Sequence, residues 1–270
     1  MSARVSVTAT IGTACRLVLD RRGELFRVGL VFILGMFAIG VFAFRYIFPL
    51  LWVQVPQVGG PVAGRPMPDP RLLPGMLLML VAEFILVAVF AVGWHRLILL
   101  GPRAGGGLGV GLGRRELAYF GRMWLCLLGF FLFTLAFVMV GSAVVATMPD
   151  VVALLAGFAY FLAVIYVLGR LGPAFAALSV DQRLGFDGAW RATAGEGTRI
   201  LAIYLLANLG WSVVTVVFST LAHALGLGLL APYAFLFVNS VLSAAMVAVL
   251  VTINAVLFRQ LAGWRPPGST

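Results

Sequence analysis

The longest uncharged stretch of the chain runs from residue 200 to residue 258 and contains no Asp, Glu, Lys or Arg. A helix needs about 20 apolar residues to cross a hydrocarbon core about 30 Å thick. The 59 residues of this stretch are therefore enough for two membrane spans with a turn between them. We place the turn between His223 and Pro232, where several Gly residues interrupt the run.

The chain as a whole carries too few charges for a soluble domain. Only 10% of its residues are charged and 62% are hydrophobic, whereas soluble domains have about 25% charged residues. We therefore predict an all-α polytopic membrane helix bundle that forms a single integral membrane domain over residues 1–270. Its six transmembrane helices are expected at residues 28–52, 75–93, 123–147, 151–169, 200–222 and 233–258.

Three segments between the apolar runs combine Arg residues with a partial apolar face. They cover residues 5–27, 113–122 and 173–195. Such segments are typical of amphipathic helices that lie in the membrane interface, and we expect them on the cytoplasmic side. Each precedes an odd-numbered span, so the chain can be read as three copies of an interfacial helix plus a helical hairpin. The alternative is that any six-span protein with basic cytoplasmic loops shows this order.

Arg residues are divided unevenly between the two sides of this arrangement. All 19 basic residues are Arg, and sixteen of them fall in segments that the six spans place on one side. The exceptions are Arg45, Arg65 and Arg71. Cytoplasmic loops carry an excess of Lys and Arg. We therefore predict that both termini lie in the cytoplasm.

The formal net charge of +10 predicts an anionic partner. In a soluble protein this charge would suggest nucleic acid, but here the Arg residues flank apolar runs. We therefore expect contact with membrane lipids, most of all with anionic headgroups, and no nucleic acid. A membrane-protein partner is the other candidate for the same surface. The residues expected to make these contacts are Arg96, Arg114, Arg115, Arg183, Trp190 and Arg191.

The most polar of the three segments lies within residues 170–199, between two long apolar stretches. Phe186 and Trp190 are four residues apart, so they lie on one face of a short helix. Asp187 and Arg191 have the same spacing and can form an ion pair on that helix. We predict short helices along the cytoplasmic interface over residues 173–195, with Trp190 toward the acyl chains.

Four polar residues are expected inside the membrane. Glu83 lies about ten residues into the second span, and an intramembrane carboxylate suggests a function or a specific partner. We expect Glu83 to face the bundle interior, where it pairs with Arg45 or stays protonated; a proton or ion relay is the alternative. Asn208 and Asn254 are expected to join helices by hydrogen bonds, with substrate binding as the alternative.

The sequence offers little for catalysis or for metal binding. Its two Cys residues and two His residues are far apart and lack the spacing of a zinc site. No set of nucleophile, base and orienting residue can be identified. We therefore predict no catalytic residue, no metal site and no cofactor.

One short segment resembles known membrane proteins. Residues 184–206, with Gly188, Ala189, Trp190, Arg191 and Gly195, are similar to uncharacterised bacterial inner-membrane proteins of the YciC-like group. They also resemble the membrane domain attached to some glycerophosphoryl diester phosphodiesterases. The resemblance implies about six spans and a multi-pass location in the bacterial cytoplasmic (inner) membrane, and it implies no activity.

These observations lead to three hypotheses about function. The first is a non-enzymatic inner-membrane accessory or scaffold protein, whose Arg-rich cytoplasmic surface contacts anionic lipid or a partner protein. The second is a small transporter or permease that uses Glu83. The third is a membrane-embedded lipid enzyme, for which the acidic residues and histidines provide little.

Overall fold

The computed structural model describes residues 5–47, 72–102, 113–145, 150–227 and 231–265. The regular structure of these residues is entirely helical, and six of the helices are long and apolar enough to cross a membrane. The prediction of an all-α polytopic bundle with six spans is confirmed, so the chain is a multi-pass membrane protein. The helices are α1 (Val7–Asp20), α2 (Arg22–Phe42), the π-helix η1 (Ala43–Ile47), α4 (Leu72–Leu100), α5 (Arg114–Val145), α6 (Asp150–Ser179), α7 (Phe186–Ala192), α8 (Gly197–Ala224) and α10 (Pro232–Leu261).

Several spanning helices extend well beyond the apolar runs that predicted them, α5 and α6 among them. Helix α5 begins at Arg114, so residues 114–122 of the expected interfacial segment form the first turns of a span. Helix α6 continues through Pro173 to Ser179, although the apolar run ends near residue 169. The prediction of interfacial helices over all of residues 173–195 is therefore wrong for its first part. Arg and Glu favour helices about as well as Leu does, so α5 includes the charged residues Arg114, Arg115 and Glu116 in its first turn.

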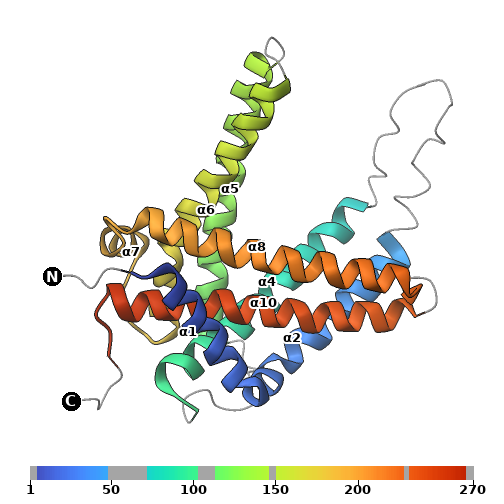
Figure 1. Ribbon diagram of the computed structural model, residues 1–270, viewed down its shortest axis with the longest axis horizontal. Coiled ribbons are helices and arrows are strands. Elements are labelled where there is room, and N and C mark those ends of the chain that lie inside the picture. The colour runs from blue at the N-terminus through green and yellow to red at the C-terminus, as the bar shows by residue number, and fades with distance from the viewer. Residues whose placement is uncertain (1–4, 48–71, 103–112, 146–149, 228–230, 266–270) are drawn as a thin grey trace.

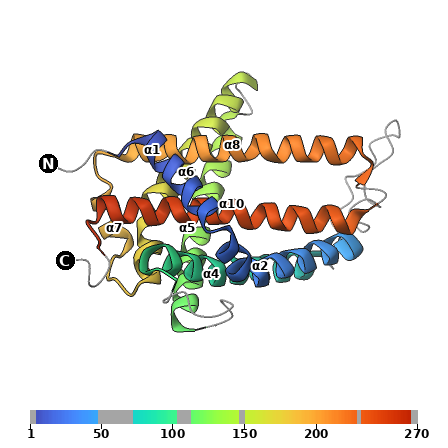
Figure 2. The same cartoon turned by 60° about the horizontal axis from the view of Figure 1, so that its bottom comes forward.

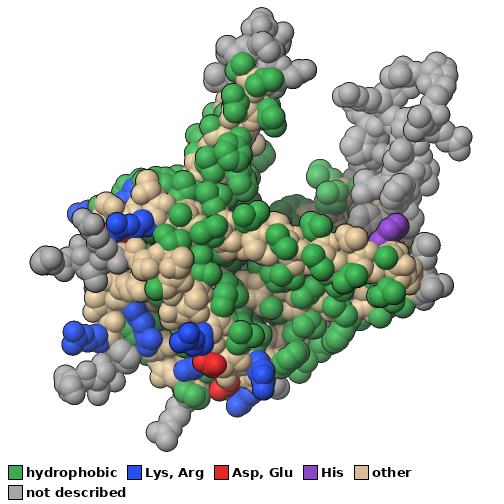
Figure 3. Space-filling view, in the orientation of Figure 1, with side chains coloured by type: hydrophobic (Ala, Val, Ile, Leu, Met, Phe, Trp, Pro, Cys, Tyr) green, Lys and Arg blue, Asp and Glu red, His purple; other side chains and the backbone are tan. Residues whose placement is uncertain are grey.

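The N-terminal and C-terminal parts of the described chain lie on the same side of the molecule, at one of its ends. Helices α1 and α7 and the C-terminal end of α10 meet there (Figure 1). Arg side chains gather at the same end, whereas hydrophobic side chains cover α8 and the α5–α6 hairpin (Figure 3). We call this end the basic end. The Pro-rich residues 48–71 and the Gly-rich residues 103–112 lie outside the described part of the chain.

Helix α10 is the centre of the bundle, and it contacts α1, α2, α4 and α6. Ala244, Ala248 and Ala255 are buried on it, and such small residues let neighbouring backbones approach closely. The indole N–H of Trp94 on α4 donates to Thr252 Oγ1 on α10 over 2.9 Å. A buried hydrogen bond between helices of this kind fixes their rotation as well as their distance.

The chain forms three sequential hairpins, α2–α4, α5–α6 and α8–α10, and they pack in different ways. Helices α2 and α4 lie against each other, as do α5 and α6, but α8 makes few contacts with α10. Helix α1 lies across α8 and α10 (Figure 2). It buries one face through Thr10, Ala14 and Val18. A separate helix therefore exists within the expected segment 5–27, and it packs on the third hairpin. Residues 22–27 of that segment belong to α2, so the prediction is wrong for this last part.

The α5–α6 hairpin leads away from α8 and α10 in both ribbon views (Figure 1 and Figure 2). No residue in the most apolar stretch of α5 is buried. An apolar surface of this extent is unsuited to water, but it is compatible with lipid because the backbone of a helix is satisfied internally. The exposed surface of the hairpin is therefore suited to contact with acyl chains.

Candidate functional site

Several Arg side chains at the basic end cap the C-terminal ends of helices. The last four carbonyl groups of a helix have no partner within the helix, and they form the negative end of its dipole. Arg21 donates to the carbonyl oxygen of Leu97 over 2.9 Å, close to the end of α4. Arg96 donates to the carbonyl oxygen of Ser179, the last residue of α6, over 3.2 Å. These Arg residues therefore have a structural role.

Asp181, just after α6, connects three helices. Its backbone has a φ of 59°, a left-handed conformation that Asp and Asn adopt more readily than most residues. Arg115 of α5 donates to both carboxylate oxygens, over 2.7 and 2.8 Å, and Arg96 of α4 lies 3.9 Å away. The hydrogen bonds from Arg115 hold the pKa of the Asp181 carboxyl below its ordinary value.

A polar cavity of about 770 Å³ opens between the start of α5 and the loop that follows α6. We call it the basic basin. Its charged lining residues are Arg114, Arg115, Glu116, Arg122, Asp181 and Arg183. The basin is therefore lined by four guanidinium groups and two carboxylate groups.

The two carboxylates of the basin are already engaged within the protein. Asp181 accepts from Arg115, and Glu116 accepts the backbone N–H of Gly113 over 3.0 Å, as a Glu in the first turn of a helix commonly does. Arg114 and Arg183 are exposed. Within the described part of the chain, neither of them has a hydrogen bond or an ion pair. The basin therefore presents two uncompensated cations to an anionic group.

Arg170 fixes the short helix α7 beside the basin. Its side chain is almost fully buried, with Nε donating to Thr193 Oγ1 over 2.9 Å and Nη2 donating to the carbonyl oxygen of Trp190. The guanidinium carbon lies 3.6 Å from the centre of the Trp190 ring, close enough for a cation–π contact. The Tyr166 hydroxyl accepts a further hydrogen bond from Nη1 of Arg170, over 3.2 Å.

Phe186, the first residue of α7, lies where the basin meets the apolar part of the hairpin. Its ring centre is 5.8 Å from the guanidinium carbon of Arg122 and 6.0 Å from the ring centre of Phe175. Arg122 also donates to the carbonyl oxygens of Ala174 and Leu184, over 2.8 and 3.2 Å. Arg122 and Phe186 therefore form one packed unit between α5, α6 and α7.

The structure brings together part of the predicted contact surface. Arg114, Arg115 and Arg183 line the basin, and Arg96 is next to it through Asp181. The other two predicted residues lie on α7, where Arg191 pairs with Asp187 as its spacing predicted, and where the Trp190 ring packs against Arg170. Sequence reasoning missed Arg122 in the basin. Its position seven residues after Arg115, two helical turns along one face, was the available signal.

The predicted partnership of Glu83 with Arg45 does not occur. Glu83 is exposed on α4, so the expectation that it faces the bundle interior is wrong. Arg45 lies in the π-helix η1, and its Nε donates to the hydroxyl of Tyr233 on α10 over 2.6 Å. None of the ion pairs among the described residues includes Glu83. Transport through Glu83 gains no support from this placement.

The two intramembrane Asn residues differ in what they join. Asn254 on α10 accepts a hydrogen bond from the Tyr204 hydroxyl on α8, so it links two helices. Asn208 donates to the carbonyl oxygen of Tyr204, one turn earlier in its own helix, over 2.7 Å. The close contact of Asn254 with Gly172 on α6 shows that three helices meet at this point.

One Ser and one His, which the sequence separates widely, lie close together near the basin. Ser179 Oγ is 3.4 Å from His95 Nδ1, and both side chains are fully buried. The Ser179 hydroxyl donates to the carbonyl oxygen of Phe175 over 3.0 Å. This buried pair therefore stabilises the contact between α4 and α6. In the described ranges, no group of three or more His, Cys, Asp or Glu residues is placed to hold a metal ion.

Comparison with protein-family models, with curated proteins and with solved structures finds no match to this chain.

Proposed function

We propose that the protein is a non-enzymatic accessory or scaffold protein of the bacterial inner membrane that binds anionic lipid headgroups at its basic end. The basic basin carries this proposal. It holds four Arg residues, and the two acidic residues that line it are engaged by other protein groups. An Arg guanidinium matches the geometry of a phosphate group and binds it with two parallel hydrogen bonds.

The position of the basin along the bundle supports the same function. It lies at the start of α5 and just after the end of α6, where these helices leave the apolar region. In a membrane, the polar headgroups flank the hydrocarbon core, next to the ends of the apolar helices. An Arg residue near an anionic membrane surface contributes about 1 kcal/mol to the attraction. If the basic end faces the cytoplasm, as the distribution of Arg predicts, the basin meets the anionic cytoplasmic leaflet.

Arg114 and Arg183 are the residues that we propose to contact the lipid phosphate. Arg115 is held by Asp181, so its role is to shape the basin. Arg122 is partly occupied by backbone carbonyl oxygens.

The proposal is tested by measuring which lipids remain bound to the purified protein. The protein is extracted in mild detergent, exchanged into mixtures of phosphatidylglycerol and phosphatidylcholine, and weighed by native mass spectrometry. We expect a preference for phosphatidylglycerol that falls about 30-fold in the double variant Arg114→Gln, Arg183→Gln, because the two lost contacts are worth about 1 kcal/mol each.

The matched control is the double variant Arg16→Gln, Arg265→Gln. It removes the same charge from exposed positions near the basic end, outside the basin. If both double variants lose the preference equally, the binding reflects net charge alone and the proposed site is wrong. Excess inorganic phosphate in a parallel sample distinguishes a lipid site from a free-phosphate site, because it should leave the bound lipid in place.

A further inference from the structure

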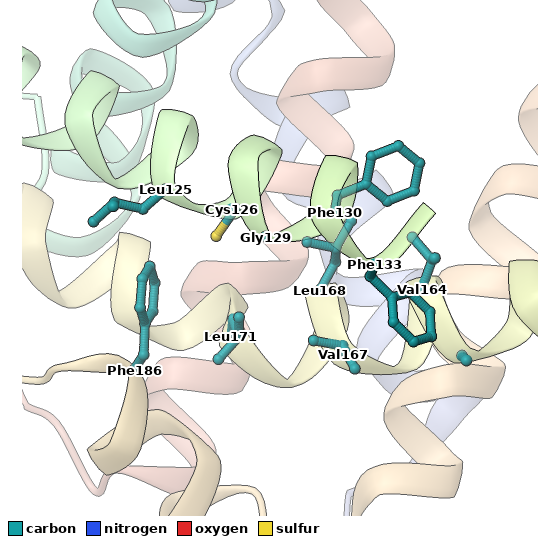
Figure 4. A pocket seen from close by; sticks show the side chains of 11 residues that line it. Leu125, Cys126, Gly129, Phe130, Phe133, Val164, Val167, Leu168, Leu171 and Phe186 are labelled. Atoms are coloured by element: carbon teal, nitrogen blue, oxygen red, sulfur yellow. The ribbon is translucent and has the colours of Figure 1, made fainter. Parts of the chain in front are cut away.

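An apolar pocket of about 400 Å³ lies between α5 and α6. Leu125, Gly129 and Phe133 line it from α5, Val164 and Leu168 line it from α6, and Phe186 of α7 lies at one end (Figure 4). Pockets of this size are within the range of small-molecule sites. Leu125 and Phe133 are eight residues apart, so the pocket extends about 12 Å along the helix. This is a little less than half of a hydrocarbon core about 30 Å thick.

The pocket adjoins the basic basin. Arg122 lines the basin, and it precedes Cys126 of the pocket by one helical turn. Phe186 lines the pocket, and its ring lies against the Arg122 guanidinium. A molecule with an anionic head and an apolar tail can therefore place the head in the basin and the tail in the pocket.

The order of the two sites along α5 matches the order of head and tail in a phospholipid. The basin lies at the start of α5, at the basic end. The pocket begins at Leu125, about three helical turns after Arg114, and continues to Phe133. Since α5 and α6 present their outer surface to lipid, a chain can enter the pocket from the side without crossing the bundle. Helix α7, held by Arg170, keeps Phe186 at the junction.

We propose that this pocket holds one acyl chain of the anionic phospholipid whose phosphate lies in the basic basin. The inference rests on the proposed function, and it adds that the protein selects a whole lipid rather than a headgroup. The chain runs from Leu125 and Phe186 near the carbonyl end toward Phe133 and Val164 near the methyl end.

The test uses phosphatidylglycerol that carries a photoreactive diazirine at a defined carbon of one acyl chain. The full-length protein is reconstituted with this lipid in phosphatidylcholine nanodiscs, irradiated, digested and mapped by mass spectrometry. A diazirine near the carbonyl end should label residues around Leu125 and Phe186. A diazirine near the methyl end should label residues around Phe133 and Val164. Labelling spread evenly along both faces of the hairpin would overturn the inference.

A pair of glycine variants gives an independent test. A Cβ atom at Gly129 or at Gly157 meets no other atom within 4 Å, so neither substitution causes a clash at that atom. Gly129 lines the pocket, whereas Gly157 on α6 does not. Gly129→Leu should reduce the labelling of the pocket about tenfold, the loss expected when about two methylene groups are no longer buried. Gly157→Leu should leave the labelling unchanged.

The outcomes separate this inference from the proposed function. If phosphatidylglycerol binding depends on Arg114 and Arg183 but Gly129→Leu has no effect on the labelling, the headgroup site stands and the chain site is wrong. If binding is insensitive to both Arg residues, the proposed function fails, and the inference fails with it. Equal losses in Gly129→Leu and Gly157→Leu would show a general effect on the hairpin and would also overturn the chain site.

Discussion

Replacement of Arg170 by Met should release α7 while the six spans stay folded. Met keeps most of the length of the side chain but donates no hydrogen bond. The variant loses the hydrogen bonds to Thr193 Oγ1 and to the carbonyl oxygen of Trp190, as well as the contact with the Trp190 ring. A hydrogen bond from a charged group contributes about 1.5–3 kcal/mol, and a cation–π contact contributes about 0.5–2 kcal/mol.

Removal of the buried charge offsets part of this loss, because an Arg without an acidic partner is costly to desolvate. We therefore expect the local free energy of opening of α7 to fall by about 2 kcal/mol, which corresponds to about a 30-fold faster exchange of its amide hydrogens. Hydrogen–deuterium exchange of residues 186–192, followed by mass spectrometry, measures this change. Quenching of Trp190 fluorescence by acrylamide should rise in parallel.

Arg191→Met is the matched control, because it removes an exposed Arg from α7 itself. The pair of Arg191 with Asp187 is largely exposed on both sides, and such a pair at this spacing contributes about 0.2–0.5 kcal/mol. Exchange should therefore rise by less than threefold, about the change that 0.5 kcal/mol produces. Equal exchange in Arg170→Met and Arg191→Met would refute the reasoning about the buried guanidinium.

Three further predictions concern other contacts. Gly172→Ala should lower the stability in detergent by about 1–3 kcal/mol, as overpacking does, because the new Cβ would lie 1.8 Å from Asn254 Oδ1; an unchanged melting temperature would contradict this. Asp181→Asn should lower stability at pH 7 by about 0.2–1 kcal/mol, the range of an exposed ion pair. The pKa of Asp181 is lowered in the folded protein. The contribution of Asp181 to stability is therefore present above the ordinary Asp pKa of about 3.9 and disappears as the pH falls through the lower folded value. Melting curves of the parent protein and of Asp181→Asn should therefore converge at low pH. Arg45 and Tyr233 share one hydrogen bond, so the effects of Arg45→Ala and Tyr233→Phe on folded yield should be less than additive. A double-mutant cycle that shows no coupling would exclude that contact.

The number and type of the main elements could be predicted because they depend on local composition. Six apolar runs of sufficient length are recognisable one at a time, and all six are helices. The ends of these helices could not be predicted from hydropathy, since Arg114 and Arg115 continue α5 in a helical conformation. The unusual backbone around Arg45, a π-helix, had no signal in the sequence.

The candidate site was less predictable, because it depends on which helices become neighbours. The sequence identified Arg114, Arg115 and Arg183 as exposed basic residues, but their convergence on one basin depends on Asp181, which lies 66 positions from Arg115. For Glu83, the prediction was wrong about the direction of the side chain. Its depth in the span could be estimated from the sequence, whereas the direction of its side chain depends on how far the neighbouring helices diverge.

The central claim is that a lipid phosphate lies against Arg114 and Arg183, and a distance between phosphorus and the guanidinium group tests it most directly. Protein labelled with ¹³C and ¹⁵N in its Arg residues is reconstituted in phosphatidylglycerol bilayers. Solid-state NMR then measures the dipolar coupling between lipid ³¹P and Arg Cζ. With 19 Arg residues in the chain, the two signals are assigned by difference, using the Arg114→Gln, Arg183→Gln variant and the Arg16→Gln, Arg265→Gln control. The account predicts strong coupling that the first variant loses and the control retains; coupling of equal strength in both variants would contradict it.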